Sequence, residues 1–236
     1  MDDEQTIAGD PVAHEGIEAV ASLGEPTRRR VYEHVSREPQ PVGKDDVAST
    51  LGLPRTTAGF HLDRLADEGL LDVDFHRRSG RTGPGAGRPA KLYQRSRSAV
   101  AVSLPPRHYD LVGELLAAAI EDAEGDGGSP REALARRARR VGADLLAGPG
   151  EVHDCDDVVA ALTRYGFEPR DEDRRVVLGN CPFHDLAERH TDLVCSMNHA
   201  LVAGLVDAAS GCRLQPRLDP APGERCCVVL ESSDSV

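Results

Sequence analysis

The segment that decides the fold is Lys44–Gly69, KDDVASTLGLPRTTAGFHLDRLADEG. Its first eight residues predict a short helix, and the sequence GLP at 52–54 predicts a turn. Residues 55–68 predict a second helix, which Gly69 closes because glycine readily adopts the left-handed backbone of a helix end. Two helices joined by a short turn that contains glycine are typical of a helix-turn-helix.

The residues after this segment predict a β-hairpin. In LDVDFHRR (71–78) apolar and polar residues alternate, as they do in a strand, and AKLY (90–93) predicts a second strand. The residues between them are rich in Gly, Pro and Arg, so a helix-turn-helix followed by a basic hairpin predicts a winged helix. GPGAGRPAK (83–91) is not a phosphate-binding loop, because it lacks the Gly-Lys-Ser/Thr ending and leads into a strand.

Charge is distributed unevenly along the chain, whose net charge is −12. Residues 1–98 hold 14 Lys and Arg against 16 Asp and Glu, whereas residues 99–236 hold 14 against 24. Within residues 75–98 there are seven basic side chains and no acidic one. A local basic patch of this kind is what a phosphate backbone requires, whatever the charge of the whole chain.

The predicted recognition helix has one face for the core and one for DNA. Ala58, Leu62 and Leu65 share the inward face, and the remaining side chains point toward the major groove, where they can contact base edges and phosphates. His61 lies at the boundary, where a packing role is the alternative. The residues predicted to contact DNA are Arg55, Thr56, Thr57, Gly59, Phe60, His61, Arg64, Arg78, Arg81, Arg88 and Lys91.

The whole chain is expected to be an α+β protein with an N-terminal winged helix-turn-helix, central dimerisation helices and a small cysteine-rich α+β sensor domain. The central helices could instead pack only on their own domain. The expected divisions are an acidic disordered tail at 1–15, the DNA-binding domain at 16–98, the helical region at 99–149, the sensor at 150–231 and a polar tail at 232–236.

Composition limits the compartment and the chemistry. The longest apolar runs are far short of a membrane span, and the acidic first residues do not resemble a signal peptide. A cytoplasmic protein is therefore expected, with no membrane partner and no evident small-molecule substrate. Thiols stay reduced in the cytoplasm, so the six cysteines are expected to be ligands or redox groups rather than structural disulfides.

Four cysteines in the last quarter of the chain are candidate metal ligands: Cys181, Cys195, Cys212 and Cys226, separated by 13, 16 and 13 residues. Because no two of them form the close pair that is common in zinc sites, the spacing favours an iron–sulfur cluster over zinc. Helix starts near Cys181 and Cys195 are expected to favour the thiolate. Cys227, next to Cys226 on a predicted strand, is expected to face the opposite way, and Cys155 is expected to be incidental. Four buried free thiols are the structural alternative.

Residues 16–230 resemble the SufR family of ArsR-type winged-helix regulators, the repressors of iron–sulfur assembly genes. The resemblance is carried by LGEPTRRRVYEHV, TTAGFHLDRLADEGLL, GRPAKLYQ, LPPRHYDLVGELL, NCPFHDLAERHTDLVC and GERCCVVL. It implies a homodimer on an inverted-repeat operator in double-stranded DNA and a [4Fe–4S] cluster held by C-terminal cysteines. Cys181, Cys195 and Cys226 match the family motifs, and Cys212 departs most from them, so Cys227 and His184 are the alternatives for the fourth ligand.

These observations predict a transcriptional regulator, most simply a repressor, whose operator binding depends on an iron–sulfur cluster. The alternative is a zinc- or thiol-redox sensor on the same DNA-binding domain. An enzyme is not expected, because the sequence offers no Cys-x-x-Cys motif, no nucleophilic triad that can be placed and no phosphate loop.

Overall fold

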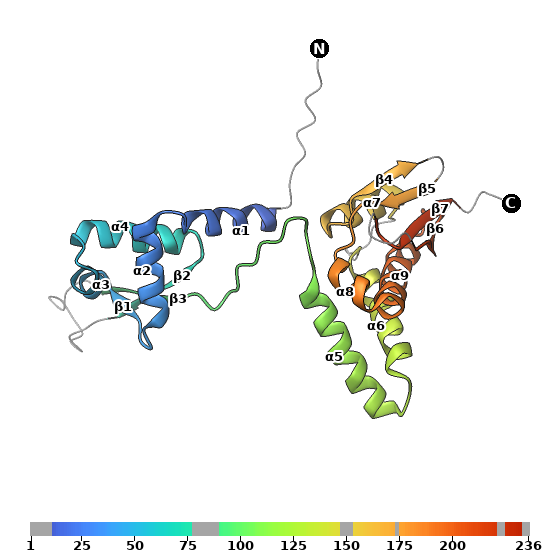
Figure 1. Ribbon diagram of the computed structural model, residues 1–236, viewed down its shortest axis with the longest axis horizontal. Coiled ribbons are helices and arrows are strands. Elements are labelled where there is room, and N and C mark those ends of the chain that lie inside the picture. The colour runs from blue at the N-terminus through green and yellow to red at the C-terminus, as the bar shows by residue number, and fades with distance from the viewer. Residues whose placement is uncertain (1–10, 77–89, 147–152, 173–174, 221–224, 233–236) are drawn as a thin grey trace, which may run out of the picture. The chain divides into compact units, whose positions relative to one another are not determined.

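The computed structural model describes residues 11–76, 90–146, 153–172, 175–220 and 225–232, and the side chains of residues 11–15 and 76 are not part of that description. The chain forms two compact units, residues 1–102 and residues 103–236. Figure 1 shows helices together with a small antiparallel sheet in each unit, which makes the protein α+β. Across the described ranges, no helix has the length and apolar character that crossing a membrane requires.

The N-terminal unit is a helix-turn-helix with two wing strands, as predicted. Its three-stranded antiparallel sheet has the order β1-β3-β2. The described elements are α1 (Pro11–Ser22), α2 (Pro26–Arg37), β1 (Val42–Gly43), α3 (Lys44–Leu51), α4 (Arg55–Asp67), β2 (Leu71–His76) and β3 (Ala90–Arg95). Helix α1 begins at Pro11, inside the segment that the sequence assigned to a tail. Proline is favoured in a first helical turn, where its missing N–H has no partner to lose.

Local signals set the boundaries of the helices in this unit. The Glu25 carboxylate accepts hydrogen bonds from the backbone N–H groups of Thr27 and Arg28, which caps α2. Gly52 ends α3 with a φ of 65°, a left-handed conformation that favours glycine. The core beneath α2, α3 and α4 includes Val31 and Leu62, both fully buried.

The C-terminal unit combines five helices with the four-stranded antiparallel sheet β4-β5-β7-β6 in its described part. Helices α5, α6 and α9 share one apolar core with this sheet. The described elements are α5 (Tyr109–Asp126), α6 (Pro130–Asp144), α7 (Cys155–Arg164), β4 (Pro169–Glu172), β5 (Arg175–Leu178), α8 (His184–Arg189), α9 (Thr191–Ala208), β6 (Leu214–Leu218) and β7 (Val228–Ser232). The two central helices therefore contribute to the core of the cysteine-rich unit.

Helices α6 and α9 touch backbone to backbone at two glycines. A Cβ atom added to Gly142 would lie 1.9 Å from the carbonyl oxygen of Leu201, and one added to Gly204 would lie 1.8 Å from that of Arg139. Both glycines are therefore required for the approach of the two helices. Because α9 also carries Cys195, this contact fixes one wall of the core that contains the buried cysteines.

Candidate functional sites

Helix α4 presents an exposed face beside the buried one, as expected for a recognition helix. Ala58, Leu62 and Leu65 are fully buried, while Phe60 keeps 63% of its surface exposed. Arg55, Thr56 and Arg64 are also exposed, and Thr57 and Gly59 are half-buried. An aromatic ring left in water on this face is available for apolar contact with bases.

His61 does not belong to the exposed face. Its side chain is buried, and its Nδ1 atom lies 3.6 Å from Oε2 of Glu25, the residue that caps α2. The prediction that His61 contacts DNA does not fit this placement. The helical periodicity put this residue at the boundary, and packing between α2 and α4 turns it inward.

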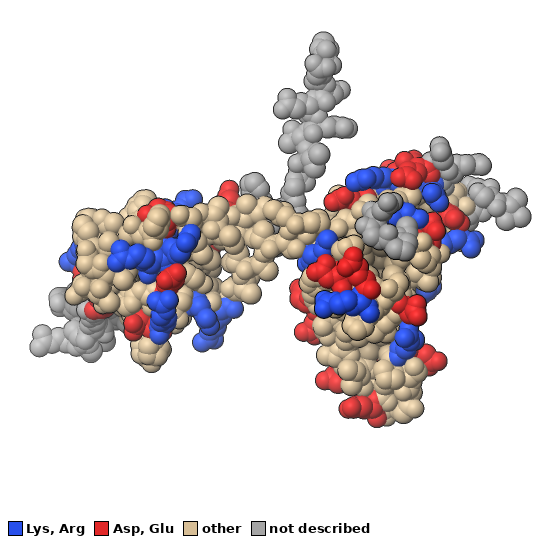
Figure 2. Space-filling model, viewed as in Figure 1, with Lys and Arg blue, Asp and Glu red and all other residues tan. Residues whose placement is uncertain are grey.

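The cationic side chains predicted to bind phosphate already have carboxylate partners. Arg55 Nε lies 2.6 Å from an oxygen of Asp45, Arg64 pairs with Glu68 one turn along α4, and Lys91 pairs with Asp63. Figure 2 shows Asp and Glu side chains beside Lys and Arg on the visible face of this unit. DNA binding would therefore exchange carboxylates for phosphates at these positions. Arg78, Arg81 and Arg88 lie outside the described residues.

Asp63 joins the recognition helix to the wing. Its carboxylate accepts a hydrogen bond of 2.7 Å from the Tyr93 hydroxyl on β3 and a second from Lys91 on the same strand. Partial burial alone would raise the pKa of Asp63, but these two hydrogen bonds outweigh it and hold the pKa below its ordinary value. Burial and the same carboxylate raise the pKa of Tyr93. The pair thus fixes the position of α4 relative to β3.

A cavity of about 470 Å³ lies between α3, α4 and the wing strands. Lys44, Arg55 and Lys91 line it together with the exposed ring of Phe75. Asp45 and Asp63 line the same cavity and pair with Arg55 and Lys91, so a phosphate group would have to displace these carboxylates there. Phe75 was predicted only as a strand residue, because alternation along a strand does not tell which face is solvent-exposed.

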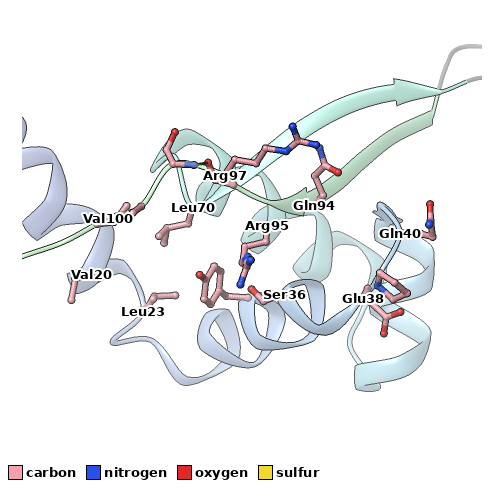
Figure 3. A pocket seen from close by; sticks show the side chains of 15 residues that line it. Val20, Leu23, Ser36, Glu38, Gln40, Leu70, Gln94, Arg95, Arg97 and Val100 are labelled. Atoms are coloured by element: carbon pink, nitrogen blue, oxygen red, sulfur yellow. Dashed lines mark hydrogen bonds between the residues drawn. The ribbon is translucent and has the colours of Figure 1, made fainter. Parts of the chain in front are cut away.

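A second cavity in this unit, of about 750 Å³, lies away from the recognition helix. Figure 3 shows side chains from α1, α2 and the segment after β3 around it, among them Val20, Leu23, Glu38 and Arg97. No residue of α4 lines it. It is therefore separate from the DNA-contacting surface.

The four free cysteines of the described residues gather in the core of the C-terminal unit. We call Cys181, Cys195, Cys226 and Cys227 the thiol cluster; all four are buried. Three separate segments supply them: the loop between β5 and α8, helix α9, and the residues just before β7. The thiols of Cys181 and Cys226, of Cys226 and Cys227, and of Cys227 and Cys195 lie close enough to influence one another's pKa.

Asn198 adds a polar side chain to the thiol cluster. It follows Cys195 by three residues on α9 and is fully buried, and its Nδ2 donates a hydrogen bond of 3.1 Å to the Cys226 sulfur. Its Oδ1 atom has no hydrogen-bond partner among the described residues. A buried amide oxygen without a partner is costly, so this group needs an explanation.

Three thiols of the cluster, those of Cys181, Cys195 and Cys226, have a pKa raised above the ordinary value. The hydrogen bond with Cys226, together with burial, raises the pKa of Cys181. Burial raises the pKa of Cys195, although its hydrogen bond with Cys227 lowers it. For Cys226 the bond with Cys181 lowers the pKa, but the bond with Cys227 and burial leave it raised, to about 12. The expectation that helix starts would favour thiolates at Cys181 and Cys195 is thus wrong for the metal-free protein.

Cys226 and Cys227 do not face opposite ways as predicted. Strand β7 begins at Val228, so the two cysteines precede it in a bend, where the side-chain alternation of a strand does not apply. Both therefore reach the same cluster. Within the described ranges, no three His, Cys, Asp or Glu side chains are already positioned as ligands of one metal ion.

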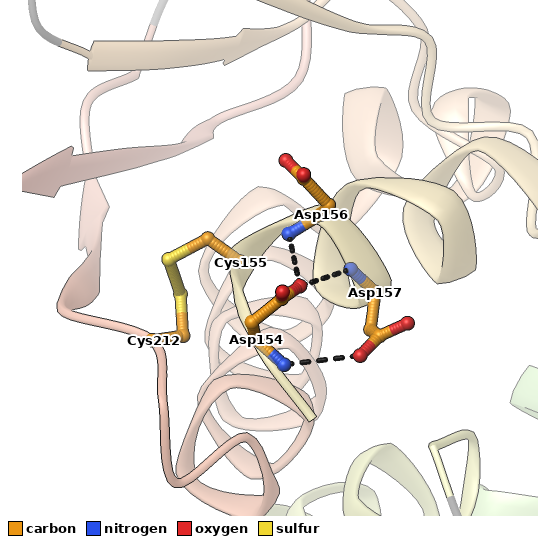
Figure 4. Close-up of a disulfide and its surroundings, with 5 residues drawn as sticks. All are labelled: Asp154, Cys155, Asp156, Asp157 and Cys212. Atoms are coloured by element: carbon orange, nitrogen blue, oxygen red, sulfur yellow. Dashed lines mark hydrogen bonds between the residues drawn. A yellow bond between two sulfur atoms is a disulfide. The ribbon is translucent and has the colours of Figure 1, made fainter. Parts of the chain in front are cut away.

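Cys212 does not belong to the thiol cluster and forms a disulfide with Cys155. The two Cα atoms are 4.6 Å apart, and the bond connects the start of α7 to the loop after α9 across 57 residues of sequence. Figure 4 shows the disulfide beside Asp154, which caps α7 by accepting hydrogen bonds from the N–H groups of Asp156 and Asp157. Cys212 is thus not a free thiol, Cys155 is not incidental, and the expectation of no structural disulfide is corrected.

Comparison with known proteins supports the N-terminal half of this description. Residues 23–74 match a family described as a helix-turn-helix domain, of the ArsR type. The matched residues run from the end of α1 to β2 and include the whole of α4. No curated protein and no solved structure matches the chain. The matched domain indicates a DNA-binding transcriptional regulator.

Proposed function

We propose that the protein is a homodimeric transcriptional repressor whose operator binding depends on an iron–sulfur cluster, most simply [4Fe–4S], in the C-terminal unit. The observation that carries the proposal is the pairing of a helix-turn-helix with a second unit in which four thiols from three segments meet in one buried core. Four thiols in one core supply the number of sulfur ligands that a [4Fe–4S] cluster takes.

DNA reading is assigned to α4 and the wing. Arg55, Thr56 and Phe60 on the exposed face of α4 would enter the major groove, while Lys44 and Lys91 beside the cavity would hold the backbone. A homodimer would place two such helices on the half-sites of an inverted repeat, about one helical turn of DNA apart.

The donor set of the C-terminal unit fits the proposed group. Thiolate sulfurs are the ligands that iron–sulfur clusters prefer, and the core that surrounds the cluster of thiols is apolar and excludes water. When bound, such a group supplies one-electron redox chemistry and sensitivity to oxygen. Binding would require that the thiols lose their protons, and the raised pKa values of Cys181, Cys195 and Cys226 mean that the metal would have to displace those protons.

The test is isolation of the full chain without oxygen. The expected product is brown, contains iron and acid-labile sulfide, and binds an operator fragment with an affinity that changes when the cluster is removed by oxidation. A colourless preparation without iron or sulfide, with operator affinity unchanged by oxygen, would refute control by a cluster and leave the helix-turn-helix assignment intact.

A second candidate is a thiol-based redox switch on the same DNA-binding domain, and the Cys155–Cys212 disulfide is the observation that favours it. In that case operator affinity would follow the oxidation state of this pair and would be insensitive to iron. Cys155→Ser separates the two functions, because it removes the disulfide and leaves all four thiols of the cluster in place.

A further inference from the structure

We infer that the fourth thiolate ligand of the metal centre is Cys227 rather than Cys212, and that Asn198 is a positioning residue that donates a hydrogen bond to the ligand sulfur of Cys226. The inference rests on the proposed function, because it names the residues that would hold the proposed group. It departs from the ligand set that the cysteine spacing and the family resemblance imply.

Cys212 is not available as a ligand while it is in a disulfide. Its sulfur is bonded to Cys155, and its side chain is partly exposed in the loop that follows α9. It is not among the thiols that hydrogen-bond to one another in the core. For Cys212 to become a ligand, the disulfide would have to be reduced and the loop would have to enter the core.

Cys227 is the free thiol that can take the fourth position. Its thiol is buried and contacts those of both Cys195 and Cys226, so it connects α9 to the segment before β7. The backbone of that segment is anchored on both sides: Cys226 N–H donates to the Leu178 carbonyl at 2.9 Å, and the Cys227 carbonyl accepts from Asp219 N–H at 2.8 Å. Two adjacent cysteines in an anchored bend can both offer sulfur to one centre.

The side chain of Asn198 places an amide beside these thiols. It is fully buried, its Nδ2 atom donates a hydrogen bond to the Cys226 sulfur, and its Oδ1 atom has no partner in the part of the chain that the structure describes. A core of four thiols alone has no need of a buried amide, which is costly when half-satisfied. An N–H donor directed at a ligand sulfur is instead a known means of setting the reduction potential of a cluster. The burial of this amide and its hydrogen bond to the Cys226 sulfur therefore support Cys226 as a ligand.

The arrangement of the four thiols is compatible with this set. They lie buried in one core and influence one another's pKa in neighbouring pairs, and no three described side chains are preformed around one ion. Metal binding would replace the thiol protons. The four sulfurs would then need to converge through side-chain rotation and a small shift of the bend before β7.

The experiment compares serine variants of the full chain, purified without oxygen. Cys227→Ser should lower iron and acid-labile sulfide per chain several-fold, as Cys181→Ser should, whereas Cys212→Ser should keep wild-type amounts. Peptide mapping of the loaded wild type should recover the Cys155–Cys212 disulfide. Cluster loss in Cys212→Ser with retention in Cys227→Ser would overturn the inference while leaving the proposed function standing.

Co²⁺ binding and circular dichroism separate loss of a ligand from loss of the fold. Each variant is loaded with Co²⁺, whose thiolate charge-transfer absorbance reports the number of sulfur ligands, and its fold is checked by circular dichroism. If the wild type holds no iron yet binds Co²⁺ through Cys227, the ligand assignment survives and the iron–sulfur proposal fails. If the wild type binds neither metal, both fail. Should Cys227→Ser not fold, Cys227→Ala takes its place.

Asn198→Leu tests the positioning role, because leucine is similar in size and cannot donate a hydrogen bond. The cluster should assemble in this variant, with its midpoint potential shifted to a lower value than that of the wild type. An unchanged potential with full iron content would show that the amide acts only in packing and would remove Asn198 from the proposal.

Discussion

The contact between α6 and α9 allows one prediction to be worked out in detail, for Gly204→Ala. The new methyl carbon would lie 1.8 Å from the carbonyl oxygen of Arg139, whereas ordinary van der Waals contact begins near 3.4 Å. Since both atoms are attached to helical backbone, no side-chain rotation can relieve the overlap. The two helices would have to separate by more than the length of a carbon–carbon bond.

The magnitude follows from two opposing effects. Overpacking in a core costs up to about 3 kcal/mol, and replacing Gly by Ala within a helix regains ~1 kcal/mol. The net loss is therefore about 2 kcal/mol, which at roughly 4 °C per kcal/mol for a unit of this size lowers its Tm by about 8 °C. Gly113→Ala is the matched control, because Gly113 is an exposed glycine in α5 with no atom within 4 Å of the added Cβ, and it should not lower the Tm.

Thermal unfolding by calorimetry or circular dichroism measures both variants, with the transition of the N-terminal unit as internal reference. A Tm for Gly204→Ala equal to or above that of Gly113→Ala would refute the direct contact of the helix backbones. The same displacement should also disturb cofactor retention, because α9 carries Cys195 and Asn198.

Four other changes have defined outcomes. Asp63→Asn should remove an acid-dependent loss of stability in the N-terminal unit. Because the pKa of Asp63 is lowered in the folded protein, its stabilising contribution is present at neutral pH and is lost as pH falls through that pKa. Melting curves of both proteins across pH would detect the difference. Arg64→Ala should weaken operator binding and lower the slope of log K against log salt by about 1, measured by titration at several salt concentrations. Phe60→Ala should change stability by less than about 0.5 kcal/mol, because the ring is exposed, yet reduce operator affinity; unchanged affinity would exclude the ring from the interface. Cys155→Ser should lower the stability of the C-terminal unit by about 4 kcal/mol through loss of a long closed loop, and a reductant should destabilise the wild type but not this variant.

The DNA-binding half was predictable because its signals are local. Gly52 and Gly69 mark the ends of α3 and α4 through backbone conformations that other residues avoid. The short turn after Gly52 separates the two helices. His61, which the helical period placed at the boundary, is buried, and α1 begins inside the segment predicted as a tail. The Nδ1 atom of His61 lies 3.6 Å from Oε2 of Glu25, a residue 36 positions away at the cap of α2, and a helical period cannot reveal this neighbour.

For the cysteine-rich unit, the sequence indicated which cysteines lie together but not which two form the disulfide. That Cys181, Cys195 and Cys226 lie near one another agrees with the reading of the sequence, although metal binding stays a prediction. The partner of Cys212 is 57 residues away, and nothing in the acidic surroundings of Cys155 signals it. Cys227 was misplaced because the apolar run CCVVL looks like one strand, whereas β7 begins only at Val228.

The carboxylate partners of Arg55, Arg64 and Lys91 have a consequence for target search on the chromosome. Cations that are already paired with carboxylates add little to the attraction of arbitrary duplex, because sequence-independent affinity comes almost entirely from unpaired positive charge. At these three positions the protein would gain little from random sites. It would be retained only where base contacts compensate for the ion pairs that it gives up.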